Sequence, residues 1–257
     1  MKRTPVVFFC LAACCSMTYA GPTSLSDGKA TIEAAAPIAA EQFSWTGFYL
    51  GARLGYGWHD GDVESHLLPD NVFRIDPSAE PNDAEGFVGG GEFGYNWQFQ
   101  RFVVGAEADF SGASVSGDSN PTIGFPPSNL TGHQPRSLDV NWFGTVRGRV
   151  GFALTPRLLI YGTGGLAYAN VDETVGAIAV VANYVNTRSS TDFGWTAGGG
   201  VEYAIFRNWT MKAEYLHSNL GDHTMTAESD VARSVFRVKY RWDAELNSVV
   251  LGVNYKF

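Results

Sequence analysis

The last twelve residues of the chain, Leu246-Asn-Ser-Val-Val-Leu-Gly-Val-Asn-Tyr-Lys-Phe257, decide the fold. Every second residue from Val249 to Phe257 is apolar, and the residues between them are small or polar except Val250. A period of two indicates a β-strand with one apolar and one polar face. In a soluble sandwich such a terminal strand would leave an apolar edge that promotes aggregation. The pattern therefore favours a strand that pairs with the first strand of the chain and closes a β-barrel.

The composition is also typical of a barrel. The 257 residues include 30 glycines, and 14% of the residues are aromatic. Charged residues make up only 17%, whereas about 25% is usual in soluble proteins. No run of about 18 apolar residues follows the N-terminal segment, so the sequence offers no spanning helix. The formal net charge of −8 argues against nucleic acid as a partner.

The N-terminal segment has the features of a secretory signal peptide. Lys2 and Arg3 form a basic start, an apolar core follows, and Thr18-Tyr-Ala20 is a small-residue cleavage site. We expect secretion with cleavage after Ala20; together with the barrel pattern, this predicts a location in the bacterial outer membrane. The alternative is a lipobox-like stretch, Leu11-Ala-Ala-Cys14, whose cysteine would be lipidated.

This segment also fixes the domain organisation and the cysteine chemistry. We expect residues 1–20 to be the signal peptide, 21–43 a flexible periplasmic leader and 44–257 the barrel. All three cysteines lie in the signal segment. The mature chain would therefore have no disulfide, thiolate metal site or cysteine nucleophile.

Eight stretches of the chain show the strand alternation. They are residues 45–58, 86–99, 102–112, 138–153, 158–170, 191–205, 209–217 and 246–257. The connections between them are alternately long and short, with long segments at 59–85, 113–137, 171–190 and 218–245. This rhythm is the signature of long outer loops and tight periplasmic turns. We predict an all-β fold, an eight-stranded antiparallel transmembrane β-barrel with four long outer loops and three short periplasmic turns.

The alternation assigns side chains to the two faces of the wall. In the stretch 138–153 it places Val140 outward and Asn141 inward. A change of parity between Trp242 and Asn247 predicts a β-bulge. Outward tryptophans near strand ends predict an interfacial aromatic girdle of Trp45, Trp58, Trp97, Trp142, Trp195 and Trp209.

Charged residues of inward parity predict a network in the barrel interior. The cations are Arg53, Arg147, Arg149 and Lys212, and the acids are Glu92, Glu107, Asp109, Asp192, Glu202 and Glu214. The interior of an eight-stranded barrel is just filled by side chains, and unpaired charges there would be costly. We expect these groups to pair as a plug that locks the barrel. The alternative is a narrow ion path lined by the same groups.

Several motifs carry a family resemblance. They include Trp45-Thr-Gly-Phe-Tyr-Leu-Gly51, Gly94-Tyr-Asn-Trp-Gln98, Trp142-Phe-Gly-Thr-Val-Arg-Gly-Arg149, Lys212-Ala-Glu-Tyr215 and Asn254-Tyr-Lys-Phe257. In this order, over residues 44–257, the chain resembles the Omp25/Omp31-type outer-membrane proteins of alphaproteobacteria, which are often labelled porin-like or surface antigens. The resemblance implies that Val253, Tyr255 and Phe257 form a C-terminal signal for the outer-membrane insertion machinery. Some relatives are described as hemin binders.

Three patterns offer chemistry, and each has a simpler explanation. Gly89-x-Gly-x-x-Gly94 matches a dinucleotide fingerprint, but it lies inside a strand with no helix after it. If His217 and Ser218 both lie on a strand, they point to opposite faces and cannot form a hydrolase dyad; this objection weakens if Ser218 already lies in the loop expected from residue 218. The histidines fall in expected loops or at a strand end, and His59, His66 and His223 could meet heme or a metal at the outer rim. Scattered surface histidines are commoner, so we predict no catalytic, cofactor-binding or metal residues and no cofactor.

These observations favour a structural and surface role in the outer membrane, serving envelope integrity and exposing loops, rather than an enzyme. The two alternatives are a narrow porin-like channel and a hemin-binding surface protein. The expected partners are the lipid bilayer and lipopolysaccharide, the insertion machinery and, through the loops, a host or hemin contact. The loops, where specificity would lie, carry no motif that names a ligand.

Overall fold

The computed structural model describes residues 43–59, 63–68, 84–120, 122–125, 130–133, 135–179, 182–228 and 237–257. These residues belong to one compact unit, Glu41–Phe257. The expected signal peptide, its cleavage site and all of the leader except Phe43 lie outside the described residues. Among the described residues, no helix is long and apolar enough to cross a membrane.

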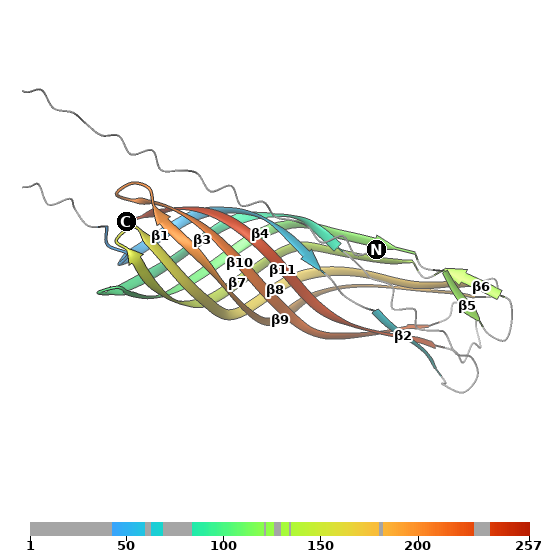
Figure 1. Cartoon of the computed structure of the whole chain (residues 1–257). Helices are drawn as coiled ribbons and strands as arrows, with labels where there is room; N and C mark the ends of the chain where they lie inside the picture. The colour runs from blue at the N-terminus through green and yellow to red at the C-terminus, as the bar shows by residue number, and fades with distance from the viewer. Residues whose placement is uncertain are drawn as a thin grey trace, which may run out of the picture. The chain divides into compact units, whose positions relative to one another are not determined.

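Eight long strands form a closed antiparallel ring (Figure 1). In ring order they are β1 Gly47–His59, β3 Ala84–Phe99, β4 Phe102–Ser119, β7 Arg136–Thr155, β8 Leu158–Ala179, β9 Ala182–Ala204, β10 Trp209–Glu228 and β11 Arg237–Lys256. The terminal strand closes the ring, because β11 pairs with β1 from Lys256 opposite Tyr49 to Asn247 opposite Trp58. The predicted fold class is confirmed.

The two ends of the ring differ. At the turn end, short connections follow β3, β7 and β9, as predicted, and Gln100 adopts a positive φ of 57° in the first of them. At the opposite end, the loop end, the strands continue well past the predicted boundaries. There β8 runs to Ala179 and β9 begins at Ala182, so residues 171–179 and 182–190 of the predicted long loop are instead paired strand.

The other predicted long loops also contain paired segments. The short strand β2 (Val63–Leu68) pairs with β11, and β5 (Thr122–Phe125) pairs with β6 (Leu130–His133). The apolar alternation ends where the apolar band ends. Backbone pairing continues because polar residues can form the same inter-strand hydrogen bonds.

Within the apolar band, the predicted faces are observed. Aromatic and aliphatic side chains of outward parity are exposed on the wall, including Phe48, Leu50, Leu54, Phe87, Phe93, Phe110, Val146, Leu166, Phe193 and Leu251. Side chains of the opposite parity are buried inside the ring. A single wall of strands therefore has an apolar exterior and a filled interior.

Two irregularities change the parity near the loop end. Val140 pairs with Val171 and Trp142 with Asn170, so Asn141 is an extra residue in β7. This bulge makes the assignments of Val140 and Asn141 wrong: Val140 is buried inside, and the exposed Asn141 donates a hydrogen bond to Asp172. Hydrogen bonds from Ser189 and Asn141 lower the pKa of the Asp172 carboxyl.

The bulge predicted between Trp242 and Asn247 is present as an irregularity in the pairing of β10 with β11. The extra residue, however, belongs to β10, between Asn219 and Asp222, where Gly221 has a positive φ of 91°.

Candidate functional site

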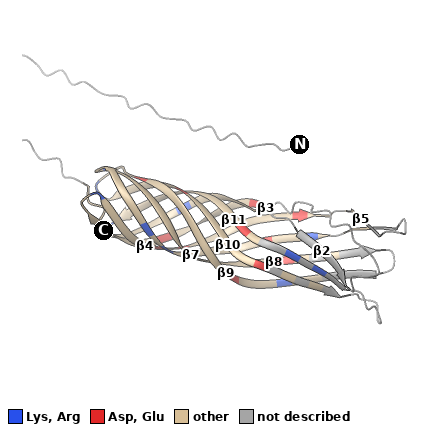
Figure 2. Cartoon of the chain, turned by 60° about the horizontal axis from the view of Figure 1, so that its bottom comes forward, with Lys and Arg blue, Asp and Glu red and all other residues tan. Residues whose placement is uncertain are grey.

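A cluster of charged side chains from the strands fills the barrel interior, and Figure 2 colours the acidic and basic positions of the chain red and blue. Glu107 on β4 lies at the centre of this cluster. Its carboxylate is 2.5 Å from Arg147 Nη2 and 3.0 Å from Lys212 Nζ, and the Tyr49 hydroxyl donates to it at 2.7 Å. Arg149 lies at 3.7 Å. One carboxylate thus joins β1, β4, β7 and β10.

The remaining acids surround the same cations. Asp109 lies 2.6 Å from Arg53 and 3.1 Å from Arg147, and it also accepts a hydrogen bond from the Thr145 hydroxyl. Arg147 further contacts Glu214 at 3.0 Å. Each guanidinium therefore contacts at least one carboxylate, as a planar multi-donor group can.

Two more acids complete the network. Glu92 is 2.7 Å from Lys212 Nζ, and Glu202 is 2.7 Å from Arg149 Nη2. The Thr210 hydroxyl donates to Glu202 at 2.6 Å. We call the charge network the nine groups Arg53, Glu92, Glu107, Asp109, Arg147, Arg149, Glu202, Lys212 and Glu214.

Burial determines what the charge network does to stability. The side chains of all nine charged groups are at most 4% exposed. At this burial each charge needs its partners, because removing one partner leaves another charge without compensation.

Asp192 lies apart from the charge network. It is nearer the loop end, where Ser190 Oγ donates to its carboxylate at 3.1 Å and Arg188 approaches to 3.9 Å. Parity correctly placed its side chain inside the ring, but parity says nothing about the level at which a side chain lies along the barrel.

An apolar layer closes the interior on the turn side. This turn-side layer consists of Phe43, Trp45, Val103, Ala153, Leu159 and Tyr161. The guanidinium carbon of Arg149 lies 3.9 Å from the Tyr161 ring centroid, so a cation–π contact joins this layer to the charge network.

Trp45 is therefore not in the outward girdle, and that prediction is wrong. Its side chain is 1% exposed, and its ring packs edge-on against Phe43 with 4.8 Å between the ring centroids. The residue precedes β1, and its backbone N–H donates to Gln98. The indole therefore packs inside the ring at the turn end, within the turn-side layer.

A second apolar layer closes the interior on the loop side. This loop-side layer consists of Ala84, Val88, Val115, Leu138, Val140, Phe143, Ala167, Ala169, Val171, Leu220, Leu246 and Val250. Along β4 the order is Val103, then Glu107 and Asp109, then Val115. The charge network is thus enclosed between two apolar layers.

The other five tryptophans of the predicted girdle face outward. Trp97 and Trp209 lie at the turn end, where Trp97 packs on Tyr95 and Trp209 on Tyr255. Toward the loop end, Phe110, Trp142, Tyr168 and Phe193 form a continuous row of ring contacts with centroids 5.7–6.5 Å apart. In the same region, Trp58 contacts Tyr215 and Trp195 contacts His217.

Tyr49 and Tyr161 were missed as site residues. Tyr49 has inward parity, but nothing in the spacing shows that its hydroxyl reaches Glu107. Gly94, which lies opposite Tyr49, was a usable signal that a large side chain crosses it: a Cβ at Gly94 would lie 2.4 Å from the Tyr49 hydroxyl. This contact also explains one glycine of the dinucleotide-like motif, which lies wholly inside β3 with no helix after it.

One of the three histidines that the heme hypothesis places at the rim lies inside the barrel instead. His59 is 5% exposed, and its ring contacts the Glu245 carbonyl. His217 lies on β10 and contacts Asn247 at 2.9 Å, whereas Ser218 is buried and donates to Thr196. His217 and Ser218 are on opposite faces, so they form no dyad. The side chains of His66 and His223 lie outside the described residues.

The comparisons with known proteins agree with this geometry. The profile of the outer membrane protein β-barrel domain matches residues 30–257. The chain belongs to this outer-membrane β-barrel family. It is 42% identical over 231 residues to the 31 kDa outer-membrane immunogenic protein of Brucella melitensis, with 88% of this chain and 90% of that protein covered.

A second relative supports the same assignment, and a solved structure shares the fold. The 22 kDa outer membrane protein of Rhizobium leguminosarum bv. viciae is 32% identical, with 83% of this chain and 79% of that protein covered. Among solved structures, OprG of Pseudomonas aeruginosa aligns with a TM-score of 0.50 at 15% identity, covering 84% of this chain and 98% of that chain. The barrel is an outer-membrane protein, homologous to surface immunogenic proteins.

The charge network predicts a large effect for Lys212→Met. The substitution leaves Glu92 and Glu107 buried with one cation fewer, so the free energy of unfolding should fall by about 3–5 kcal/mol. Urea titration of the purified barrel in detergent micelles measures this change. Lys239→Met, at an exposed position of β11, is the matched control and should change stability by less than about 0.5 kcal/mol. Equal stability of the two variants would contradict the role of the charge network.

Proposed function

We propose that the protein is a structural, surface-exposed outer-membrane barrel whose interior is sealed by the charge network, and that it is not an enzyme. The observation that carries this proposal is the position of the charge network between two apolar layers. A role in envelope integrity follows, because a sealed, ion-paired barrel resists both leakage and unfolding.

The narrow-channel alternative is disfavoured by the same arrangement. An ion would have to cross the turn-side layer, displace buried ion pairs and then cross the loop-side layer. Each step removes solvation without offering a replacement. The charges that could line a path are already committed to one another, with contacts of 2.5–3.1 Å around Glu107 and Asp109.

The hemin-binding alternative loses one of its three rim histidines. The His59 ring lies inside the barrel against the Glu245 carbonyl, and the side chains of His66 and His223 lie outside the described residues.

The proposed surface role depends on the parts of the strands that extend, at the loop end, beyond the aromatic row of Phe110, Trp142, Tyr168 and Phe193. On this extension of β11, Lys239 and Arg241 are exposed, and Arg241 contacts Asp222 at 2.9 Å. We assign this region to the cell exterior, where its basic side chains suit the phosphate groups of lipopolysaccharide. The names of the Brucella relatives as outer-membrane immunogenic proteins support a surface role for this chain.

Insertion is assigned to the outward residues of the terminal strand. Val253, Tyr255 and Phe257 are 41%, 37% and 71% exposed, respectively, and the Tyr255 and Phe257 rings are in contact at 5.2 Å between centroids. Such an apolar row on the closing strand is accessible before β11 pairs with β1, as an insertion signal must be.

The sealed interior predicts that the purified protein gives no steady conductance in planar bilayers. The double variant Trp45→Ala/Leu159→Ala opens only the turn-side layer, so it should also remain closed because the charge network and the loop-side layer persist. Single-channel recording measures both. A steady, reproducible conductance of the unmodified barrel would contradict the proposal and favour the channel.

The proposed orientation predicts which engineered cysteines react in intact cells. Lys239→Cys should be labelled by a membrane-impermeant maleimide, whereas Gln100→Cys, in the turn between β3 and β4, should react only after the outer membrane is permeabilised. Because all three native cysteines lie in the expected signal peptide, the cleaved protein provides an unlabelled background. Labelling of Gln100→Cys in intact cells would show that the turn end faces the cell exterior and would contradict the proposed orientation.

A further inference from the structure

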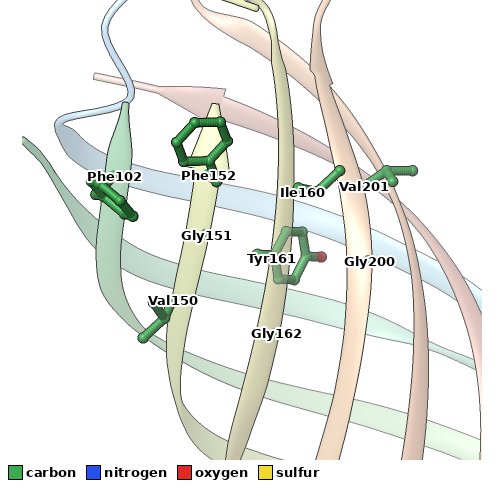
Figure 3. Close-up of a pocket in the computed structure, with 9 residues that line it drawn as sticks. All are labelled: Phe102, Val150, Gly151, Phe152, Ile160, Tyr161, Gly162, Gly200 and Val201. Atoms are coloured by element: carbon green, nitrogen blue, oxygen red, sulfur yellow. The ribbon is translucent and has the colours of Figure 1, made fainter. Parts of the chain in front are cut away.

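The outward wall of the barrel contains a hollow close to the turn end. It has a volume of about 560 Å³. Figure 3 shows its residues, Phe102, Val150, Gly151, Phe152, Ile160, Tyr161, Gly162, Gly200 and Val201. Phe102, Phe152, Ile160 and Val201 are partners in register on β4, β7, β8 and β9, so they form one row just above the short turns.

Beyond this row the outward positions become small. Val150 is opposite Gly162, which is opposite Gly199; in the next row Gly148 is opposite Gly164, which is opposite Ala197. The small residues end at a row that contains Val146, Leu166 and Trp195. The lining of the hollow ends at Val150 and Gly162, and the small outward residues continue from there to the row of bulky side chains.

Packing within the barrel does not require these glycines. A Cβ added at Gly148, Gly162 or Gly164 would meet its nearest neighbour at 3.9, 3.8 or 3.5 Å, which is ordinary contact. Inward glycines differ: a Cβ at Gly165 would lie 2.1 Å from the Val146 carbonyl oxygen. The outward wall would accept side chains at these three positions, so their absence creates space that faces the lipid.

The turns below the hollow are basic. Arg101 lies between β3 and β4, Arg157 between β7 and β8, and both are exposed. Their carbonyls accept hydrogen bonds from Ala153 and Ala204 at 2.7 and 2.8 Å, which ties each turn to the next strand of the wall. The third turn carries Arg207, and the segments 98–102, 154–158 and 205–209 contain no acidic residue.

We propose that the hollow binds one acyl chain of a phospholipid of the periplasmic leaflet, and that Arg101 and Arg157 bind its phosphate group. An apolar hollow beside exposed guanidinium groups matches the two chemical parts of such a lipid. Lipopolysaccharide lies in the opposite leaflet, above the loop-end aromatic row. A second copy of the chain packed on the hollow would bring the arginine turns of both copies together, and their like charges would repel.

Native mass spectrometry of the delipidated full-length protein, titrated with phosphatidylglycerol in non-ionic detergent, tests this assignment. The unmodified barrel should retain one phosphatidylglycerol, and Gly162→Leu should weaken binding about tenfold because it fills the hollow. Arg101→Gln and Arg157→Gln should each weaken binding about tenfold through loss of a charge-assisted hydrogen bond. Gly164→Leu provides a second filling variant if the first does not fold.

The matched control is Ala52→Leu, which adds bulk to the outward face of β1 and should leave binding unchanged. The gel mobility of each variant before and after boiling shows whether it is folded. Equal binding by Gly162→Leu and Ala52→Leu, or equal retention of a neutral diacylglycerol, would overturn the proposal. A dimer of the unmodified barrel that Gly162→Leu dissociates without any bound lipid would assign the hollow to a second copy instead.

Discussion

The carboxylate of Glu107, held by Arg147 and Lys212 and by the Tyr49 hydroxyl, is the contact on which the rest of the interior depends. The constraint behind it is geometric, because eight strands close around an interior that side chains just fill. Charges placed there lose water and must find partners on the opposite wall. The resulting contacts join strands that are not neighbours in the ring, so they brace the barrel across its diameter as well as around it.

The turn-side layer and the loop-side layer separate the charge network from both ends of the barrel. Trp45 and Leu159 separate it from the turn end, and Val115 and Phe143 separate it from the loop end. The proposed sealed interior and the proposed surface role are therefore linked: if the paired charges fill the interior, the surfaces that remain for function are the extended strands at the loop end and the lipid-facing wall near the basic turns.

The strand number, the ring closure and the inward or outward direction of most side chains were predictable from the sequence, because burial on one face imposes a period of two. Parity fails where a residue is inserted, as at Asn141, and it does not specify the level along the barrel, which is why Asp192 was grouped with Glu107. The error at Trp45 has another origin: the residue shares its parity with the inward Tyr49 and Arg53, and it was assigned to the girdle by residue type and not by parity. The prediction of long loops was wrong for a different reason. Hydropathy indicates which residues contact lipid, whereas strand pairing depends only on backbone hydrogen bonds. Pairing in β8 therefore continues beyond the apolar residues, to Ala179.

The most direct test of this account is a double-mutant cycle between Glu107 and Arg147. The free energies of unfolding of Glu107→Gln, Arg147→Met and the double variant would be measured by urea titration in lipid vesicles and compared with the unmodified barrel. We predict that the double variant loses less stability than the sum of the two single losses, by at least about 1.5 kcal/mol. The reason is that the second substitution removes a charge that the first left without its partner. Additive losses would show that the two side chains act independently and would contradict the charge network as the element that holds the barrel interior together.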